Sequence, residues 1–397
     1  MNVHCLADNI FYVGVDDREK HLFENLWPLP YGVSYNSYLI LGSEKTALID
    51  GVEIDFLTEL MDHIESTGHE RKIDYMVVNH MEPDHSGVIP WIVKAFPEIK
   101  LIGNRQTIEM IKGFYHIESP ENFHIVADGD EISLGDKTLR FVFTPMVHWP
   151  ETMMTYCPEN KFLFSGDAFG GFGALNGAVL DQETDDVETY FGEMYRYYAN
   201  IVAKYGRFVQ GAFKKLGDTP IEYICSTHGL VWHSLIPRVL DIYNRLSNYQ
   251  SEEGATVIYG SMYGNTASMA EYIAARLVEK GIKTVRIHKA TFENMSQMIT
   301  DAFRYKYLIV GSPTYSMELF PAVEALMRAL QVREIKGKRF AAFSSYTWAP
   351  SVALKRFQEY AEAIKMPLLA SAQMKQNNFN EVKADLDALV DCVVKEN

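Results

Sequence analysis

The sequence predicts an α/β protein of two domains, in which a layered domain with a mixed sheet precedes a doubly wound parallel sheet. Residues 1–50 contain short runs rich in β-branched and aromatic residues, and strand-like and helix-like runs alternate after them. A polar stretch at 249–254 (Tyr-Gln-Ser-Glu-Glu-Gly) predicts a boundary between domains at 1–250 and 251–397. Beyond it, strand-like runs near 256, 284, 307 and 339 with helical patterns between them are typical of a doubly wound sheet.

Composition narrows the class of function. The 397 residues are 47% hydrophobic and 22% charged, as in ordinary soluble globular proteins. The formal net charge of −15 argues against nucleic acid and anionic membranes as partners. We find no signal-peptide pattern and no apolar run of about 18 residues, the length that a membrane helix needs. The four cysteines form no C-x-x-C pair, so we expect a reducing, cytoplasmic location and no disulfide.

The first domain begins with predicted strands at 10–15, 37–41 and 46–49 and a helix at 56–64. A further strand at 75–79 leads into His80-Met81-Glu82-Pro83-Asp84-His85, in which four of the six side chains are of metal-binding types. Proline is disfavoured inside helices and central strands. We therefore expect these residues to form a loop at a strand end, followed by a helix from Ser86.

Three later loops repeat this arrangement. Predicted strands at 137–144, 162–165 and 223–226 are followed by His148, Asp167 and His228. We expect a histidine or carboxylate at each strand end between Asn79 and His228, on one side of one sheet. A buried strand at 100–103 and helical patterns at 105–112, 184–204 and 236–246 complete the domain.

Side chains from these loops form a candidate metal-ligand set: His80, Glu82, Asp84, His85, His148, Asp167 and His228. Imidazole and carboxylate ligands without thiolate suit iron or manganese better than structural zinc. One metal takes about four to six ligands, so this set indicates two metals with a shared carboxylate. Asp167, alone in its loop, is the predicted bridge. The alternative is a group of separate polar loops with no common centre.

The second domain opens with a strand at 255–260, the loop Ser261-Met262-Tyr263-Gly264-Asn265-Thr266 and a helix. Free backbone N–H groups, the positive helix end and two hydroxyls favour a phosphate there. The loop is neither a Walker loop nor G-x-G-x-x-G, and it is similar to the loop of flavodoxin that binds the phosphate of FMN. The loops Ser312-Pro313-Thr314-Tyr315 and Ser345-Tyr346-Thr347-Trp348 add hydroxyls and aromatic rings for a flat isoalloxazine. Plain β–α turns with core aromatics are the alternative.

Taken together, the two halves resemble the flavodiiron proteins, also called A-type flavoproteins, over about residues 3–393. The first half resembles the metallo-β-lactamase fold, an αββα sandwich whose usual loop is H-x-H-x-D-H. Glu82 replaces the second histidine of that loop, which favours iron. The resemblance implies a flavodoxin-like second domain and the minimal two-domain class. Thr347 departs from the glycine that many members carry before the tryptophan.

The resemblance also implies an activity and its cofactors. One iron would be held by His80, Glu82 and His148 and the other by Asp84, His85 and His228, with Asp167 as the bridge. In some relatives the imidazole equivalent to His85 is turned away from the metal. The implied reaction is reduction of dioxygen to water, of nitric oxide to nitrous oxide, or both, with electrons delivered through FMN and no catalytic side chain beyond the ligands.

The implied partners are an electron donor such as rubredoxin and a second copy of the chain. A head-to-tail homodimer, or a dimer of dimers, would bring the FMN of one subunit to the iron pair of the other. We expect a slim apolar gas route lined by Tyr35, Trp149 and Phe169, for which plain core packing is the alternative.

Two other functions are consistent with parts of the sequence. One is a binuclear zinc hydrolase with an accessory flavodoxin-like domain, against which Glu82 argues. The other is an electron carrier that uses FMN alone and leaves the clustered ligands without a role.

Overall fold

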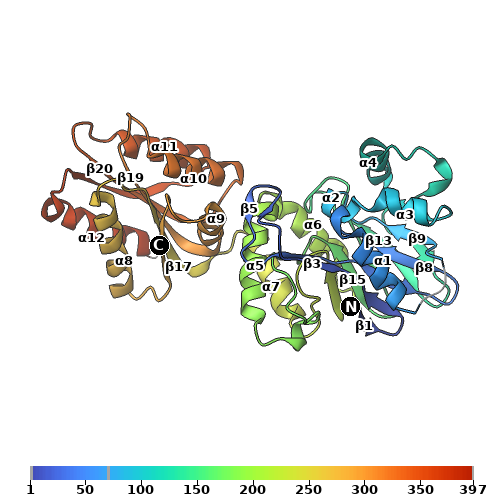
Figure 1. Cartoon of the computed structure of the whole chain (residues 1–397). Coiled ribbons are helices and arrows are strands. Elements are labelled where there is room, and N and C mark those ends of the chain that lie inside the picture. Colours follow the sequence, from blue (N-terminus) through green and yellow to red (C-terminus); the bar gives the residue numbers. More distant parts are fainter. Residues whose placement is uncertain (1–2, 69–71, 396–397) are drawn as a thin grey trace. The chain divides into compact units, whose positions relative to one another are not determined.

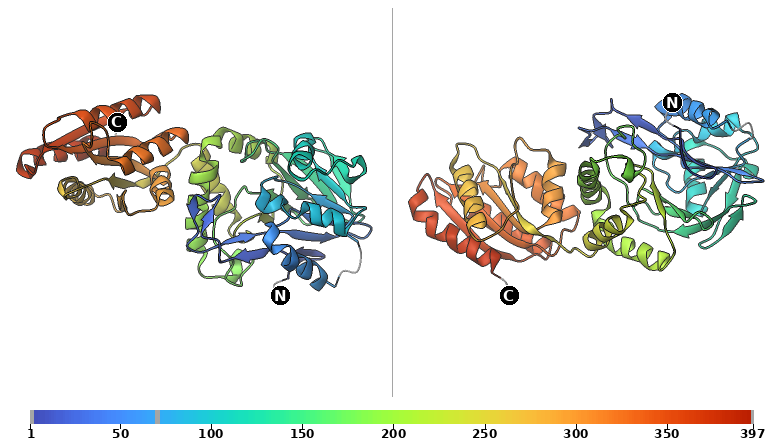
Figure 2. Two further views of the ribbon diagram at one scale, coloured as in Figure 1. Left: turned by 45° about the horizontal axis from the view of Figure 1, so that its top comes forward. Right: turned by 90° about the horizontal axis from the view of Figure 1, so that it is seen from below.

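The computed structural model describes residues 3–68 and 72–395, which form two compact units. The first unit contains the chain up to Tyr198 together with Tyr205–Asn244. The second contains Ala199–Lys204 and the chain from Arg245 onward. Figure 1 labels the elements of each unit, and Figure 2 shows them from two further directions.

The first unit contains a mixed sheet with the strand order β1-β2-β7-β8-β9-β10-β11. Its strands are β1 (His4–Ala7), β2 (Ile10–Tyr12), β7 (Tyr38–Leu41), β8 (Thr46–Ile49), β9 (Tyr75–Val77), β10 (Lys100–Gly103) and β11 (Phe123–Ile125). Pairing is antiparallel from β1 to β8 and parallel from β8 to β11. The carboxyl ends of β9 and β10 therefore lie at the same edge of this sheet.

A second sheet in the same unit has the strand order β12-β13-β14-β15-β16. Its strands are β12 (Glu131–Ser133), β13 (Thr138–Phe143), β14 (Met153–Cys157), β15 (Phe162–Gly166) and β16 (Tyr223–Ser226). Two short ribbons pair β3 (Val15–Asp17) with β6 (Val33–Tyr35) and β4 (Leu22–Phe23) with β5 (Trp27–Pro28).

Helices cover the outer faces of the two sheets, which gives the predicted αββα layers. They are α1 (Leu57–Ser66), α2 (Pro83–Ser86), α3 (Ile89–Ala95), α4 (Arg105–Tyr115), α5 (Val187–Tyr197), α6 (Gly206–Leu216) and α7 (Ile236–Ser247). Helix α4 packs against β10 and β11 of the first sheet, and α6 packs against β13 of the second.

Apolar and polar contacts join the two sheets. The ring of Tyr38 on β7 lies 5.3 Å from the ring of Phe164 on β15, and its hydroxyl donates to the carbonyl of Ser226 at 2.6 Å. The backbone N–H of Met153 donates to the carbonyl of Asn79 at 3.0 Å. Asn79 follows β9 and Ser226 ends β16, so these contacts join the two sheets at the end where the loops after β9 and β16 leave them.

The second unit is a doubly wound parallel sheet with the strand order β18-β17-β19-β20-β21. Its strands are β17 (Glu252–Tyr259), β18 (Val285–Lys289), β19 (Tyr305–Pro313), β20 (Arg339–Tyr346) and β21 (Leu368–Lys375). Its helices are α8 (Asn265–Glu279), α9 (Met295–Arg304), α10 (Pro321–Val332), α11 (Val352–Ala363) and α12 (Phe379–Val394). Helices α8 and α12 pack together over one face, and α9, α10 and α11 follow one another over the other.

Several expectations from the sequence need correction. The predicted site loops leave two sheets, not one side of a single sheet, because β9 belongs to the first sheet and β13, β15 and β16 to the second. A histidine or carboxylate does not follow every strand of this region, because the residue after β10 is Asn104. The pattern missed β1, β4, β5, β6, β11, β12 and β14, each of five residues or fewer, and it also missed the longer β21, in which exposed and less exposed positions alternate.

Two helix boundaries also differ. Pro83 occupies the first position of α2, where a missing N–H is tolerated, so Asp84 and His85 lie in a helical turn and not in a loop. The pattern at 184–204 is broken: α5 ends at Tyr197, and a π-helical and a 3₁₀ segment fill Tyr198–Tyr205. Residues 252–254, expected in the boundary segment, belong to β17.

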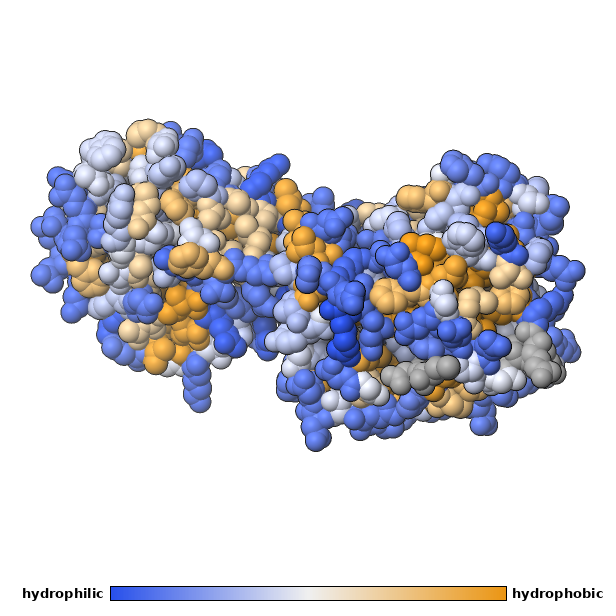
Figure 3. All heavy atoms as spheres, in the orientation of Figure 1, coloured by the Kyte–Doolittle hydropathy of each residue, from blue (hydrophilic) through white to orange (hydrophobic). Residues whose placement is uncertain are grey.

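Within the described ranges, none of the helices has the length and apolar character needed to cross a membrane. Figure 3 shows that hydrophobic residues form separate patches among hydrophilic ones on the drawn face of each unit.

Candidate metal centre and flavin cavity

The turn after β9 is fixed by a buried carboxylate. Asp50 accepts hydrogen bonds from the backbone N–H of Asn79 at 2.7 Å and from its side-chain amide at 2.9 Å. The chain then passes through His80 and Glu82 into α2. This turn directs the His80 ring and the Glu82 carboxylate toward the loops that leave the second sheet.

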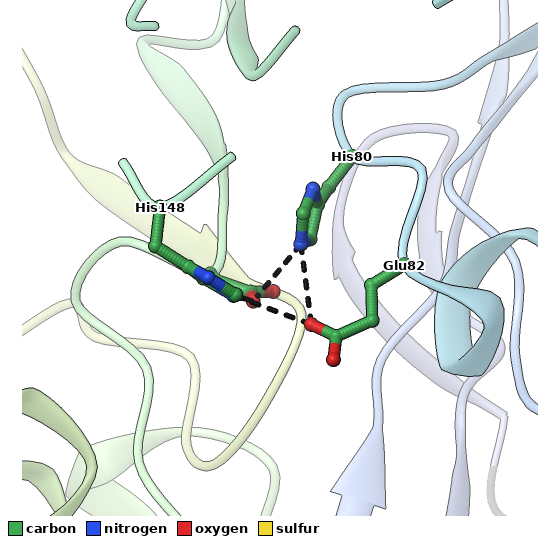
Figure 4. Close-up of side chains that lie close together, drawn as sticks. His80, Glu82 and His148 are labelled. Atoms are coloured by element: carbon green, nitrogen blue, oxygen red, sulfur yellow. Dashed lines mark hydrogen bonds and ion pairs between the residues drawn. The ribbon is translucent and has the colours of Figure 1, made fainter. Parts of the chain in front are cut away.

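A first group of side chains consists of His80, Glu82, His148 and Asp167, all buried, with ligand atoms within 4.8 Å of one another. Nε2 of His148 lies 3.2 Å from Oε2 of Glu82 and 3.0 Å from Oδ2 of Asp167. Nε2 of His80 lies 3.3 Å from the same Glu82 oxygen. Figure 4 shows both rings directed at the Glu82 carboxylate from separate loops.

A second group consists of Asp84, His85 and His228, also buried. Oδ2 of Asp84 lies 3.4 Å from Nε2 of His85 and 3.4 Å from Nε2 of His228. Nε2 of His85 lies 3.1 Å from Oδ1 of Asp167. Asp167 therefore presents Oδ2 to the first group and Oδ1 to the second, and all seven predicted metal-ligand residues are close together.

Gly166 makes this position of Asp167 possible. Its φ of 57° lies in the left-handed region that glycine adopts without strain, and the chain turns out of β15 there. Two hydroxyl groups hold the carboxylate that follows: Tyr197 donates to Oδ2 at 2.7 Å, and Thr227 donates to Oδ1.

The buried histidines and carboxylates of the site shift one another's pKa values. Burial alone would lower the pKa of His148, but hydrogen bonds to Asp167 and Glu82 raise it to about 9. Burial is likewise outweighed at His85, where Asp84 and Asp167 raise the pKa to about 9. Burial would raise the pKa of Asp167, yet the charges of His80 and His85 hold it well below its usual range.

Buried polar atoms that make no hydrogen bond indicate whether the site can hold cations. Both carboxylate oxygens of Asp84 and Nε2 of His228 are buried and make no hydrogen bond. Such atoms are costly to bury unless a further partner is present. They face one another across the second group, and their chemistry, carboxylate and imidazole, is that of iron or manganese ligands. The residues therefore fit a pair of cations.

Aromatic rings surround the ligands. The ring of Trp149 meets the ring of His80 edge-on at 5.2 Å, and the rings of Phe23 and Tyr35 meet that of His228 at 5.4 and 5.8 Å. Phe169 lies elsewhere, because its ring packs against Tyr243 at 4.7 Å. Tyr35 and Trp149 thus lie beside the ligands, and Phe169 packs in the neighbouring core.

Some residues around the site carry no signal of that role in the sequence. Phe23 and Tyr197 lie in segments with no metal-ligand pattern, and only the folded chain brings them to the ligands, whereas Thr227 directly precedes the predicted ligand His228. Glu151 could have been noticed, since it is an acidic residue three positions after His148.

The second unit contains a cavity of about 270 Å³ at the carboxyl ends of β17, β19 and β20. Eleven of the fourteen predicted flavin-binding residues line it: Ser261, Met262, Tyr263, Asn265, Thr266, Pro313, Thr314, Ser345, Tyr346, Thr347 and Trp348. Gly264, Ser312 and Tyr315 do not, and the cavity is also lined by Ser316, Met317 and Ala349.

Hydrogen bonds join the loops of this cavity. The Thr266 and Ser345 hydroxyls lie 2.8 Å apart, and the Ser261 hydroxyl accepts from the backbone N–H of Gly264 at 3.2 Å. The cavity therefore opens at the amino end of α8, where free N–H groups favour a phosphate. Tyr263 is 91% exposed and Trp348 85% exposed, so two rings stand at its rim with little covering them.

Comparison with known proteins agrees with this architecture. Residues 33–229 match the family described as ODP family beta lactamase, and residues 257–387 match flavodoxin. The anaerobic nitric oxide reductase flavorubredoxin of Pectobacterium atrosepticum is 34% identical over 355 residues, covering 88% of this chain and 68% of that protein. The chain belongs to the flavodiiron protein family.

Solved structures of flavodiiron proteins match nearly the whole chain. The flavodiiron protein of Giardia intestinalis gives a TM-score of 0.93 at 27% identity and covers 99% of this chain and 96% of that one. The rubredoxin oxygen:oxidoreductase of Desulfovibrio gigas gives a TM-score of 0.92 at 26% identity, with 99% and 98% covered. The expected combination of a metallo-β-lactamase-like and a flavodoxin-like part is confirmed for this flavodiiron chain.

Proposed function

We propose that this flavodiiron protein reduces dioxygen to water, nitric oxide to nitrous oxide, or both, at two iron ions that receive electrons through FMN. One observation carries the proposal: the Asp167 carboxylate presents one oxygen to each of two buried groups of histidines and carboxylates. The second unit has a cavity beside the loop 261–266, which is of a phosphate-binding type, and this cavity supports the proposal that FMN is the second cofactor.

The residues that would hold the cofactors follow from the two groups. His80, Glu82 and His148 would hold one iron and Asp84, His85 and His228 the other, with Asp167 shared. When bound, the iron pair supplies Lewis acidity and electrons to a small gas molecule, and FMN supplies further electrons. The amino end of α8 would take the flavin phosphate, with Tyr346 and Trp348 near the ring.

The chain's own residues orient the ligands and exclude water. Tyr197 and Thr227 fix the shared carboxylate by hydrogen bonds to its two oxygens. The rings of Phe23, Tyr35 and Trp149 form an apolar wall beside the histidines. Such a wall admits a small apolar gas more readily than water, and it strengthens electrostatic interactions inside the site.

The printed names of the relatives support the substrates and the donor. One relative is named a nitric oxide reductase and another a rubredoxin oxygen:oxidoreductase, so we propose a donor of the rubredoxin type for this chain. We also propose a head-to-tail homodimer or a dimer of dimers. The exposed Tyr263 and Trp348 at the flavin cavity support it, because a second copy would cover them.

The four cysteines are all free, which supports a reducing compartment such as the cytoplasm.

A size measurement on the active protein tests the proposed dimer, because an active monomer would contradict it.

The experiment for the activity is anaerobic reduction of the iron- and FMN-loaded protein, followed by separate additions of dioxygen and nitric oxide. We expect rapid reoxidation of the flavin with consumption of at least one gas. A protein that purifies with zinc, shows esterase or lactamase activity and consumes neither gas would instead be the hydrolase.

A further inference from the structure

A buried carboxylate lies behind one of the histidine ligands. Glu151 is fully buried, and its Oε1 accepts hydrogen bonds from Nδ1 of His80 at 2.9 Å and from the backbone N–H of Met81 at 2.9 Å. The side-chain amide of Asn104 donates to the carbonyl of Glu151 at 2.6 Å. Glu151 therefore joins the loop that carries His148 to the loop that carries His80.

The second group has no equivalent. Nδ1 of His228 lies 2.7 Å from the backbone carbonyl of Ser34, which is a neutral acceptor. Nδ1 of His85 is buried and makes no hydrogen bond in the described part of the chain. Of the three, only the His80 imidazole is backed by a charged group.

This difference has a physical consequence for a bound metal. A carboxylate that accepts the second N–H of an imidazole fixes its tautomer and orientation and makes the other nitrogen a stronger donor to a metal. A neutral carbonyl in the same place also orients the imidazole, but it strengthens the binding of the other ring nitrogen to a metal less than a carboxylate does. The second oxygen of Glu151 is buried without a hydrogen bond, so its charge needs a positive group nearby. A cation beyond the His80 ring provides that charge.

We propose that the two metal positions are unequal, and that Glu151 is the positioning residue that makes the position formed by His80, Glu82 and His148 bind its metal more tightly. The inference rests on the proposed function, because it ranks the two positions that the function requires. Loss of metal would begin at the position formed by Asp84, His85 and His228.

Metal binding to single positions tests this. In His228→Ala only the first position stays complete, and in His148→Ala only the second does. Fe²⁺ would be added anaerobically to metal-free protein, and its affinity would be measured by competition with a chelator. We expect two unequal binding events in the wild-type chain, and the tighter one to remain in His228→Ala.

Glu151→Gln then separates charge from shape, because glutamine keeps an acceptor oxygen. In the His228→Ala background we expect Glu151→Gln to weaken Fe²⁺ binding about 10–100-fold. In the His148→Ala background we expect no change. Asp181→Asn is the matched control: Asp181 is a buried carboxylate that accepts from the backbone N–H groups of Ser234 and Leu235, at 3.1 and 2.7 Å, and contacts no ligand.

Thermal unfolding of the metal-free variants, together with the visible spectrum after Co²⁺ is added, shows whether each variant folds and keeps its ligand geometry. Equal affinities in the wild-type chain would overturn the inference, as would a Glu151→Gln change that weakens both positions alike or neither. Failure of the wild-type chain to bind Fe²⁺ at all would overturn the proposed function instead.

Discussion

The Tyr197 hydroxyl donates a hydrogen bond of 2.7 Å to Oδ2 of Asp167, the carboxylate oxygen that also lies 3.0 Å from Nε2 of His148. Tyr197 is the last residue of α5, and Asp167 follows β15. A helix and a strand end that are distant in sequence thus fix the orientation of the carboxylate that faces both groups of ligands.

Tyr197→Phe removes that hydrogen bond and keeps the ring. A hydrogen bond to a charged group contributes about 1.5–3 kcal/mol, so we expect a looser carboxylate, weaker iron retention and slower gas reduction. Iron content and the spectrum of the iron pair check this. Tyr156→Phe is the control, because its hydroxyl donates to the carbonyl of Pro220 at 2.6 Å and lies on β14 away from the ligands. Equal iron content in Tyr197→Phe and Tyr156→Phe would contradict the expectation.

Asp167→Ala removes the carboxylate that faces both groups. We expect loss of both irons, since each position loses a ligand and the histidines that surround Asp167 lose the charge that balances them. Metal analysis after reconstitution checks this result, and gas consumption should fall to background. If Asp167→Ala kept two irons and full activity, neither the shared carboxylate nor the diiron proposal would stand.

Iron binding should depend on pH. The pKa values of His85 and His148 are raised to about 9 in the metal-free protein, so both rings are protonated at pH 7 and must lose their protons to bind a metal. We therefore expect affinity to rise with pH up to about 9, with protons released on binding. Calorimetry in buffers of different ionisation enthalpy counts these protons, and an affinity independent of pH between 6 and 9 would contradict the prediction.

Iron affinity should rise with pH, but the stability of the metal-free protein should fall with pH because of the same two histidines. Because their folded pKa values lie above the usual value of about 6.5, they stabilise the metal-free fold fully below that pH. This stabilisation is lost as pH rises through 9. Melting temperatures of the metal-free chain across this range measure the effect.

Thr266 and Ser345, whose hydroxyls lie 2.8 Å apart, join two loops of the flavin cavity. We expect Thr266→Ala to weaken FMN binding about ten-fold, the equivalent of one hydrogen bond of about 1.4 kcal/mol. Fluorescence titration of the FMN-free chain measures it. Ser268→Ala is the control, because Ser268 lies on the same helix but donates to the carbonyl of Gly264 and does not line the cavity. An equal effect of the two changes would argue against a phosphate at this loop.

Lys338 is a buried lysine in the second unit, and burial lowers its pKa to about 7. Its Nζ donates to the Ser251 hydroxyl at 2.7 Å and to the carbonyl of Phe303. In the unfolded chain this lysine keeps its proton up to about pH 10.4, whereas in the folded chain it loses the proton near pH 7. The free energy of unfolding should therefore rise with pH between about 7 and 10. Relative to Lys338→Met, the wild-type chain should gain up to about 1.4 kcal/mol per pH unit in that window. Parallel unfolding curves of both chains at pH 7 and 9 check the sign.

The sequence by itself determined the types of ligand, the segments that carry them and the phosphate-binding type of loop before α8. These features are local: a strand-like run, a proline, a glycine or a cluster of histidines and carboxylates has a meaning within about ten residues. The parallel sheet of the second unit was predictable for the same reason, since its strands and helices alternate regularly.

Only the tertiary structure decided that the ligand loops leave two different sheets, that Asp167 divides its oxygens between two groups, and that Glu151 lies behind His80. The pairing of Met153 with Asn79, and of Tyr38 with Phe164, joins segments more than seventy residues apart. Such pairings depend on how buried faces pack together, which periodicity along the chain does not specify, because many partners satisfy the same hydrophobic pattern.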